Sequence, residues 1–359
     1  MSARGRPESL DAYVVLTDHG DPEHFQGVRE RIDPQWSWLE TGFLRGRMKF
    51  LRSGIRGLGM YLRSLRYPSR AVIVTYGASH GFVLAVLQHS FRHIREPRVH
   101  LMFDLLLDRP RSGWARFRDT AKAWIFNRAI DGAVVWGKSD VDLFARAHGL
   151  DRRKLRFHPY HITLDDFGGV VWEPGDGGYV FCGGNVGRDF ETVIEALGPT
   201  GIPVVIATQV EGVAQVAARY PSITVRGVTP VEFRHLLASS TVVVEAHPAG
   251  FFRTAGHQTM LNALYLGKPV VVCDRRSAAA YVRDGVDGYV LDCGDRAGLQ
   301  KAVIALWTRP DLRAKMERRA RAKASRPLYS TLGHMQSVYD LAMRLDRRKR
   351  GEASFRSTG

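Results

Sequence analysis

The chain has 359 residues, of which 45% are hydrophobic, and its formal net charge is +16 at pH 7. This length predicts two domains of ordinary size, each with its own core. The sequence has no run of eighteen apolar residues and no apolar segment of a signal peptide, so a secreted or membrane-spanning protein is not expected. Its three cysteines lack the spacing of metal ligands. They are typical of buried thiols in a reducing cytoplasm.

The N-terminal half reads as strand, loop and helix, repeated four times. Strands are expected at residues 12–17, 71–76, 99–103 and 132–136, each followed by polar residues. This order predicts a doubly wound parallel sheet, which binds ligands beyond the carboxyl ends of its strands. After the fourth strand, Ser139 or Asp140 is expected to cap the next helix.

Two side chains in this half are candidates for catalysis. His80 lies in a glycine-flanked loop after the second predicted strand, and Asp104 ends the third. Both positions lie where such a sheet presents its ligands, so either side chain could orient or deprotonate a hydroxyl of a bound substrate. The alternative for each, and for the histidine above all, is a structural role.

A basic segment occupies residues 41–95, where ten Lys or Arg residues occur without a single Asp or Glu. Its apolar residues recur at steps of three and four, which places them on one face of a helix. They are Leu44, Met48, Leu51, Ile55, Leu58, Leu62 and Leu65. Either this stripe packs on the sheet and the arginines are solvated, or the helix binds an anionic membrane surface. In the second case the expected contacts are Arg45, Arg47, Lys49 and Arg52. Nucleic acid is less favoured as a partner, because no nucleic-acid-binding signature accompanies the charge.

The second half predicts another domain of the same kind. Its strands are expected at residues 179–182, 204–207, 223–226, 241–245, 270–273 and 289–291, with helices at 256–266 and 277–283. We therefore expect an N-terminal domain over residues 1–170, a C-terminal domain over 171–330 and a final helix over 331–345. The basic tail, 346–359, should be disordered, because its few apolar groups cannot offset the entropy of ordering it.

Several motifs of the second half resemble the C-terminal domain of glycosyltransferase family 4, which has the GT-B fold. They are Gly267-Lys268-Pro269-Val270, Val282-Arg283-Asp284-Gly285, Gly288-Tyr289-Val290 and Gly294-Asp295. Residues 179–184 with 188–197 resemble the first strand, glycine loop and helix of that domain, and the resemblance covers about residues 130–345. It implies two Rossmann-like domains with a cleft between them and a C-terminal helix that crosses back to the first domain. It also implies sugar transfer from a nucleotide-sugar, with retention, to a lipid-linked or membrane-proximal acceptor in surface polysaccharide synthesis. The enzyme would then be peripheral at the inner face of the cell membrane.

The expected donor site combines this resemblance with the chemistry of the residues. Glycines allow a phosphate group to approach the backbone closely. Arg188 stands where the family has a basic residue that binds the diphosphate. A helix that starts at Gly256 offers free N–H groups to the same diphosphate. The donor-binding candidates are Gly183, Gly184, Arg188, Glu245, Arg253, Thr254, Gly256, His257, Gln258 and Asn262. For Glu245 the alternative is a solvated residue at a strand end.

Thr254 and Asn262 occupy positions where family 4 members usually carry two glutamates. Asn262 could still accept a hydrogen bond from a ribose hydroxyl. The missing glutamates leave a catalytically silent protein that binds nucleotide-sugar, or a partner, as the alternative to an active enzyme. No cofactor and no metal site are expected, since Arg188 and helix dipoles can neutralise the diphosphate.

Overall fold

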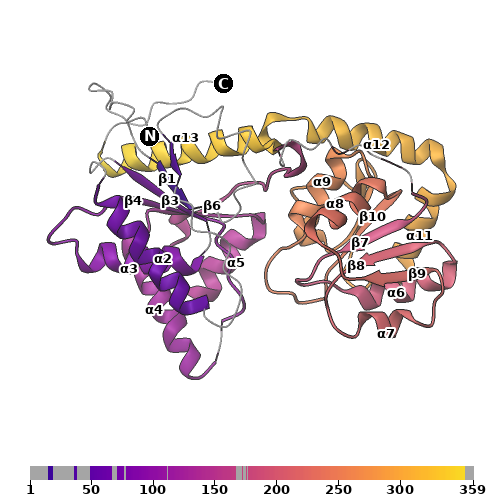
Figure 1. The fold of residues 1–359 in the computed structure, drawn as a ribbon, viewed down its shortest axis with the longest axis horizontal. Helices are drawn as coiled ribbons and strands as arrows, with labels where there is room; N and C mark the ends of the chain where they lie inside the picture. Colours follow the sequence, from indigo (N-terminus) through magenta and orange to yellow (C-terminus); the bar gives the residue numbers. More distant parts are fainter. Residues whose placement is uncertain are drawn as a thin grey trace, which may run out of the picture.

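The computed structural model describes residues 15–18, 36–38, 49–66, 71–76, 78–110, 112–166, 172, 175 and 177–351. They form two α/β domains that lie side by side (Figure 1). The N-terminal sheet is parallel and has the order β2-β1-β3-β4-β5-β6. Its strands are β1 (Val15–Asp18), β2 (Trp36–Trp38), β3 (Val72–Tyr76), β4 (Val99–Phe103), β5 (Gly132–Val135) and β6 (Leu155–Phe157). Sequence reasoning missed β2 and β6, because strands of three residues show no periodicity.

In the described part of the N-terminal domain, this sheet is accompanied by α2 (Lys49–Ser64), α3 (Ala78–Ser90), α4 (Trp114–Ala129) and α5 (Lys138–His148). The predicted cap of α5 was wrong. Its N-cap is Gly137, which makes no side-chain cap, while Ser139 and Asp140 lie inside the first turn. Asp140 is buried and bonds a residue of the other domain, described below.

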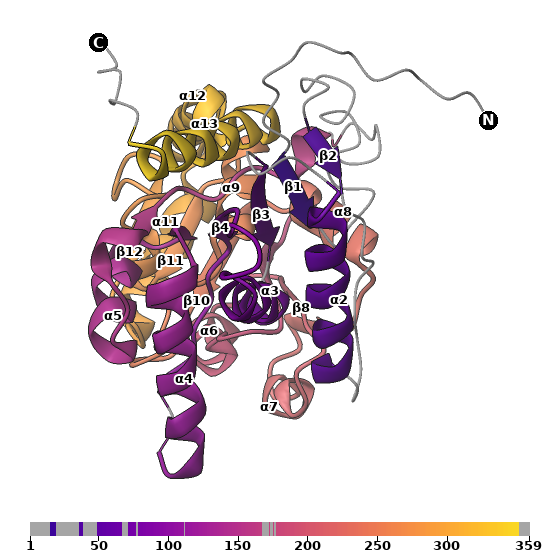
Figure 2. The ribbon, with the colours of Figure 1, turned by 90° about the vertical axis from the view of Figure 1, so that its left-hand side faces the viewer.

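Helix α2 lies beside α3 (Figure 2) and packs against it through the face that carries Gly57 and Met60, not through its apolar stripe. A Cβ atom added to Gly57 would lie only 2.5 Å from the Cβ of Val83 on α3, so glycine permits this close approach. The stripe residues Ile55, Leu58 and Leu62 are 61%, 46% and 52% exposed. Packing of these residues on the sheet is therefore excluded, and they remain available for an external partner.

The C-terminal sheet is also parallel, with the order β12-β11-β10-β7-β8-β9. Its strands are β7 (Val180–Gly183), β8 (Val204–Ala207), β9 (Ile223–Arg226), β10 (Val242–Ala246), β11 (Val270–Cys273) and β12 (Gly288–Leu291). All six lie within one residue of the predicted positions. In β7, β10 and β11 the residues are buried on both faces and leave a continuous apolar signal.

The helices around this sheet are α6 (Phe190–Leu197), α7 (Val213–Ala217), α8 (Pro230–Ser239), α9 (His257–Tyr265), α10 (Arg275–Ala278), α11 (Arg296–Thr308) and α12 (Pro310–Ala324). Helix α10 is shorter than the predicted 277–283 and lies earlier, since Asp274 caps it by accepting from the Arg276 amide. The chain then turns so that the buried Tyr281 can reach the N-terminal domain.

The last helix, α13 (Thr331–Lys349), runs back across the N-terminal domain (Figure 1). Met335, Val338 and Ala342 share a core cluster with Val72 of β3 and Leu101 of β4. The helix continues four residues beyond the predicted end at 345. Lys349 donates to the Pro97 carbonyl and Asp346 is buried against Arg350, so the predicted disordered tail begins too early. Among the described residues, no helix is long and apolar enough to cross a membrane.

Candidate functional site

A cavity of about 1100 Å³ lies between the two domains, at the carboxyl ends of both sheets. The N-terminal domain lines it with Asp104 and Leu106 after β4, Trp136 after β5, and Tyr160. The C-terminal domain contributes the loops after β7, β8 and β10 and the first turns of α8 and α9. Strands β7 and β10 are neighbours where the strand order reverses, which is where open α/β sheets bind ligands.

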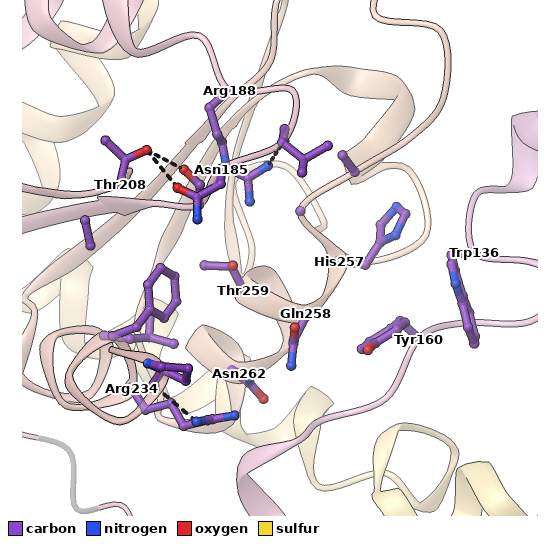
Figure 3. Close-up of a pocket in the computed structure, with 18 of the residues that line it drawn as sticks. Trp136, Tyr160, Asn185, Arg188, Thr208, Arg234, His257, Gln258, Thr259 and Asn262 are labelled. Carbon is purple, nitrogen blue, oxygen red and sulfur yellow. Dashed lines mark hydrogen bonds between the residues drawn. The ribbon is translucent and has the colours of Figure 1, made fainter. Parts of the chain in front are cut away.

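Most of the predicted site residues line this cavity. These are Asp104, Gly184, Arg188, Arg253, Thr254, Gly256, His257, Gln258 and Asn262. Figure 3 shows Arg188, His257, Gln258 and Asn262 around the pocket, with Tyr160 and Trp136 opposite. His80, Gly183 and Glu245 are not among its lining residues.

The expectation that His80 lies where the sheet presents its ligands was wrong. Helix α3 begins at Ala78, so His80 lies in the first turn of a helix instead of a loop, and its backbone carbonyl faces Gly57 of α2. The side chain is buried at 7% exposure. A structural role, the alternative named for this histidine, fits that position.

Arg188 is held in place by its own loop and by Glu245. Its Nε donates to the Gly183 carbonyl at 2.8 Å and lies 3.1 Å from Glu245 Oε2. The side chain is 8% exposed. Gly184 has a φ of +123°, and a Cβ there would lie 2.8 Å from Nη2 of Arg188. Glycine at this position therefore makes room for the guanidinium.

Glu245 is neither a solvated strand-end residue nor a lining residue of the cavity. Its side chain is fully buried at the end of β10. A Cβ on Gly256 would lie 2.9 Å from Glu245 Oε2, so the start of α9 sits directly against this carboxylate. Burial raises the pKa of Glu245 to about 7, although the charge of Arg188 and a hydrogen bond from Thr259 oppose the rise.

The N-terminus of α9 opens into the cavity. Gly256, in the left-handed conformation with a φ of 79°, is its N-cap and makes no side-chain cap. His257, Gln258 and Thr259 form the first turn and line the cavity. Unpaired first-turn N–H groups and the positive end of the helix dipole make such a terminus suitable for phosphate.

The two residues at the glutamate positions of family 4 make contacts with other parts of the fold. Thr254 Oγ1 donates to Asp140 of the N-terminal domain at 2.6 Å. Asn262 binds Thr163 at both ends of its amide: Oδ1 accepts from the backbone N–H and Nδ2 donates to Oγ1, each at 2.9 Å. Sequence reasoning missed Asp140 and Thr163 as partners, because both lie about a hundred residues away in the chain.

Asp104 is the strongest catalytic candidate in the N-terminal domain. Among the described residues other than glycine, it alone has a positive φ, of 68°. Such a conformation is costly and concentrates at functional sites. Its Oδ1 accepts a hydrogen bond from Trp136 Nε1. Burial raises the pKa of Asp104 to about 6, opposed by the Trp136 hydrogen bond and by the charge of Arg253.

Further lining residues were not predicted. Thr208 Oγ1 donates to the Gly184 carbonyl at 2.9 Å, and the amide of Gln209 donates to Asn185 Oδ1 at 2.8 Å. Phe233 and Arg234 of α8 line the same side of the cavity. Thr208 lies one residue after a predicted strand, and this position could have identified it as a lining residue of the cavity.

Two further predictions concern a metal site and a membrane surface. Within the described part of the chain, no group of three or more His, Cys, Asp or Glu residues could hold a metal ion. Of the predicted membrane contacts, Lys49 and Arg52 belong to α2, while Arg45 and Arg47 lie outside the described residues.

The chain resembles known proteins in part of its sequence and in its fold. Residues 240–323 match the family model described as glycosyl transferases group 1. No curated protein matches the chain. Similar solved structures include Anabaena HepE in complex with UDP-glucose, at 15% identity and a TM-score of 0.67, covering 92% of this chain and 99% of that chain. Sucrose-phosphate synthase from Thermosynechococcus elongatus has 14% identity and a TM-score of 0.63, with coverages of 92% and 89%. WaaG, a glycosyltransferase involved in lipopolysaccharide biosynthesis, has 13% identity and a TM-score of 0.52, with coverages of 91% and 99%. These matches confirm the GT-B resemblance and do not single out family 4.

Proposed function

We propose that the chain is a glycosyltransferase that binds a nucleotide-sugar in the interdomain cavity and transfers the sugar to an acceptor held by the N-terminal domain. One observation carries this proposal. The cavity has Arg188 and the N-terminus of α9 on one wall and Asp104 on the other. Cation, helix terminus and carboxylate are the groups that a diphosphate and an acceptor hydroxyl require. HepE, which shares the fold, holds UDP-glucose.

In this proposal the diphosphate lies against Arg188 and the first turn of α9, with Gly183 and Gly184 giving the backbone room to approach. Arg253, His257 and Gln258 supply further hydrogen-bond donors along the same wall. Asn262 lies where the ribose is expected, although its amide already binds Thr163. Arginine and helix dipole would neutralise the leaving group without a metal ion.

We propose retention of configuration, because the resemblance implies it and the leaving diphosphate can assist the incoming hydroxyl. Inversion is the second candidate, favoured by Asp104, the one acidic side chain among the described lining residues. A carboxylate in that position can serve as a general base. NMR of the first-formed product distinguishes the two, since the anomeric configuration is retained in one case and inverted in the other.

For the acceptor we propose a lipid-linked or membrane-proximal glycan. Ile55, Leu58 and Leu62 present an exposed apolar face on α2, in a segment without acidic residues. Arg63 and Arg66, also exposed, follow at the end of this helix. An apolar face with basic residues binds the interface of an anionic membrane. The protein would then act at the inner face of the cell membrane, in the synthesis of a surface polysaccharide.

A catalytically silent nucleotide-sugar binder is the alternative, favoured by the contacts that Thr254 and Asn262 make within the fold. A panel of nucleotides and nucleotide-sugars, screened by thermal stabilisation, tests donor binding, because a ligand at 100 times its Kd stabilises the fold by about 2.7 kcal/mol. We expect stabilisation by at least one nucleotide-sugar and hydrolysis or transfer by the same compound. Stabilisation without turnover would favour the silent alternative, and no stabilisation by any member would contradict both.

A further inference from the structure

Directly behind the proposed diphosphate subsite, two buried hydrogen-bond acceptors face each other. Oε2 of Glu245 and Nε2 of His247 lie 3.8 Å apart, and both side chains are fully buried. Neither atom has a hydrogen-bond partner among the described residues, although Oε2 also forms an ion pair with Arg188, whose Nε lies 3.1 Å away. Buried polar atoms without hydrogen bonds are costly, so a proton bound between these two would lower the free energy of the folded protein.

The other ring nitrogen of His247 fixes which atoms accept. Nδ1 lies 2.5 Å from the Gly187 carbonyl oxygen, which can only accept, so Nδ1 carries the proton of the neutral ring. Nε2 therefore carries a lone pair and can only accept a hydrogen bond, 3.8 Å from the carboxylate oxygen. One proton bound by this pair would turn two facing acceptors into a donor and an acceptor, and the two groups would titrate as a unit.

The pair is connected to the cavity through two contacts. Arg188, which lines the cavity, has its Nε 3.1 Å from Glu245 Oε2. Gly256 at the start of α9 covers both acceptors, because a Cβ there would lie 2.9 Å from Oε2 and 3.0 Å from Nε2. In the protein without donor, the charge of Arg188 is therefore offset by Glu245. A diphosphate at this place would compete with Glu245 for the guanidinium.

We propose that the Glu245–His247 pair takes up one proton from solvent when a nucleotide diphosphate group binds at Arg188, and that Glu245 thereby positions the guanidinium for the donor. The proton forms one O–H bond on the carboxylate, and no other covalent bond changes. This inference rests on the proposed function, since it needs a donor diphosphate in the cavity. Glu245 does not touch the donor and acts through Arg188.

The charges around the pair favour a proton on Glu245. Burial raises the pKa of Glu245 to about 7 and lowers that of His247 to about 4. The groups that face the pair are Arg188 from the loop after β7, His257 and the Thr259 hydroxyl from α9, Cys182 from β7, and Asp274 and Arg276 after β11. Burial lowers the pKa of His257 to about 3, so that ring stays neutral. Added negative charge from a diphosphate raises the proton affinity further.

Calorimetry of UDP-glucose binding, in buffers of different ionisation enthalpy, measures the proton directly, with GDP-mannose as a second probe. Neither probe has a group of its own that titrates near neutral pH. We expect uptake of about half a proton near pH 8 and much less near pH 6, where the pair already holds it. If binding raises the proton affinity by about one pH unit, Kd should rise up to about tenfold between these pH values.

Glu245→Gln should bind the probe with no proton uptake and a Kd independent of pH. Glu211→Gln, which changes an exposed carboxylate of the same domain, should behave like the wild type. Wild-type binding without proton uptake above pH 7, or full uptake by Glu245→Gln, would overturn the inference and leave the proposed function intact. If Glu245→Gln fails to fold, the wild-type measurement alone decides. Absence of binding by every nucleotide-sugar of the panel would overturn the proposed function and this inference with it.

Discussion

Tyr281 Oη donates a 2.6 Å hydrogen bond to the carbonyl oxygen of Trp136, which joins the C-terminal domain to the N-terminal domain behind the cavity. The same hydroxyl accepts from the Tyr160 amide at 2.9 Å. Trp136 in turn donates its indole N–H to Asp104. The position of the candidate catalytic carboxylate thus depends on a side chain of the other domain.

Tyr281→Phe should destabilise the protein by about 1–3 kcal/mol, because it leaves a buried carbonyl and a buried amide without their partner. Chemical unfolding measures the loss. Tyr289→Phe, on strand β12, removes the same hydroxyl from a half-buried tyrosine and should have little effect. Equal midpoints for Tyr281→Phe and wild type would show that the hydroxyl does not hold the domains together.

On the inverting route, Asp104→Asn should lower kcat by about 10²-fold or more, because the amide can still accept from Trp136 but cannot take up a proton from the acceptor. On the retaining route, where the diphosphate assists the hydroxyl, the loss should be smaller. Since burial raises the pKa of Asp104 to about 6, kcat/KM of the wild type should fall as the pH drops below that value and the carboxylate is protonated. The control is Asp142→Asn on α5, which removes an exposed carboxylate paired with Arg152. A loss below about tenfold would remove Asp104 from acceptor activation.

Arg188→Ala should weaken the binding of a nucleoside diphosphate by about 1.5–3 kcal/mol, the value of a charge-assisted contact. It should also destabilise the fold, but by less than the about 3–5 kcal/mol of a broken buried ion pair, because Glu245, whose pKa is already raised to about 7 by burial, can take up a proton. Adding Glu245→Gln should restore most of the stability and none of the affinity. Arg296→Ala, which breaks an exposed pair with Glu191, serves as the control for both measurements. Unchanged nucleotide affinity in Arg188→Ala would place the diphosphate elsewhere.

The glycines of α2 should respond in opposite directions to alanine. Gly57→Ala should cost about 1–3 kcal/mol, because its Cβ would collide with Val83 and push α2 away from α3. A Cβ at Gly54 or Gly59 meets nothing within 4 Å, so Gly54→Ala and Gly59→Ala should stabilise the helix by about 0.5–1 kcal/mol each. Thermal unfolding of the three variants compares them. A stable Gly57→Ala would mean that α2 does not pack as described.

The protein should co-sediment with anionic vesicles at low salt and less so as salt rises, because the attraction is screened within a Debye length. Leu58→Ser with Leu62→Ser should reduce sedimentation by removing apolar area. Replacing Arg45, Arg47, Lys49 and Arg52 by Gln should reduce it by removing charge. Val210→Ser with Val216→Ser, two exposed apolar residues of the C-terminal domain, is the matched control. Wild-type protein that stays in the supernatant would contradict the membrane proposal, and nucleotide binding should survive in every variant.

The strands of the C-terminal domain could be predicted from the sequence to within one residue. Runs such as Val270–Cys273, buried on both faces and bounded by Gly267 and Asp274, carry a local signal that needs no knowledge of the rest of the chain. Local sequence signals also explain why Arg188 and the start of α9 could be assigned to the cavity. Both follow directly on predicted elements, and parallel strands bring their carboxyl ends to one edge.

The buried face of α2 could not be predicted from the sequence. Periodicity reveals an apolar stripe, but it cannot show that Gly57 allows α2 to approach α3 closely and leaves the stripe residues exposed. The tertiary structure also decided the partners of Thr254 and Asn262, which lie about a hundred residues away along the chain. The burial of Glu245 against Arg188 and His247 likewise depends on tertiary packing and could not be predicted from the sequence. A charged residue at a strand end looks solvated in the sequence, and only the packing of α9 over it removes the water.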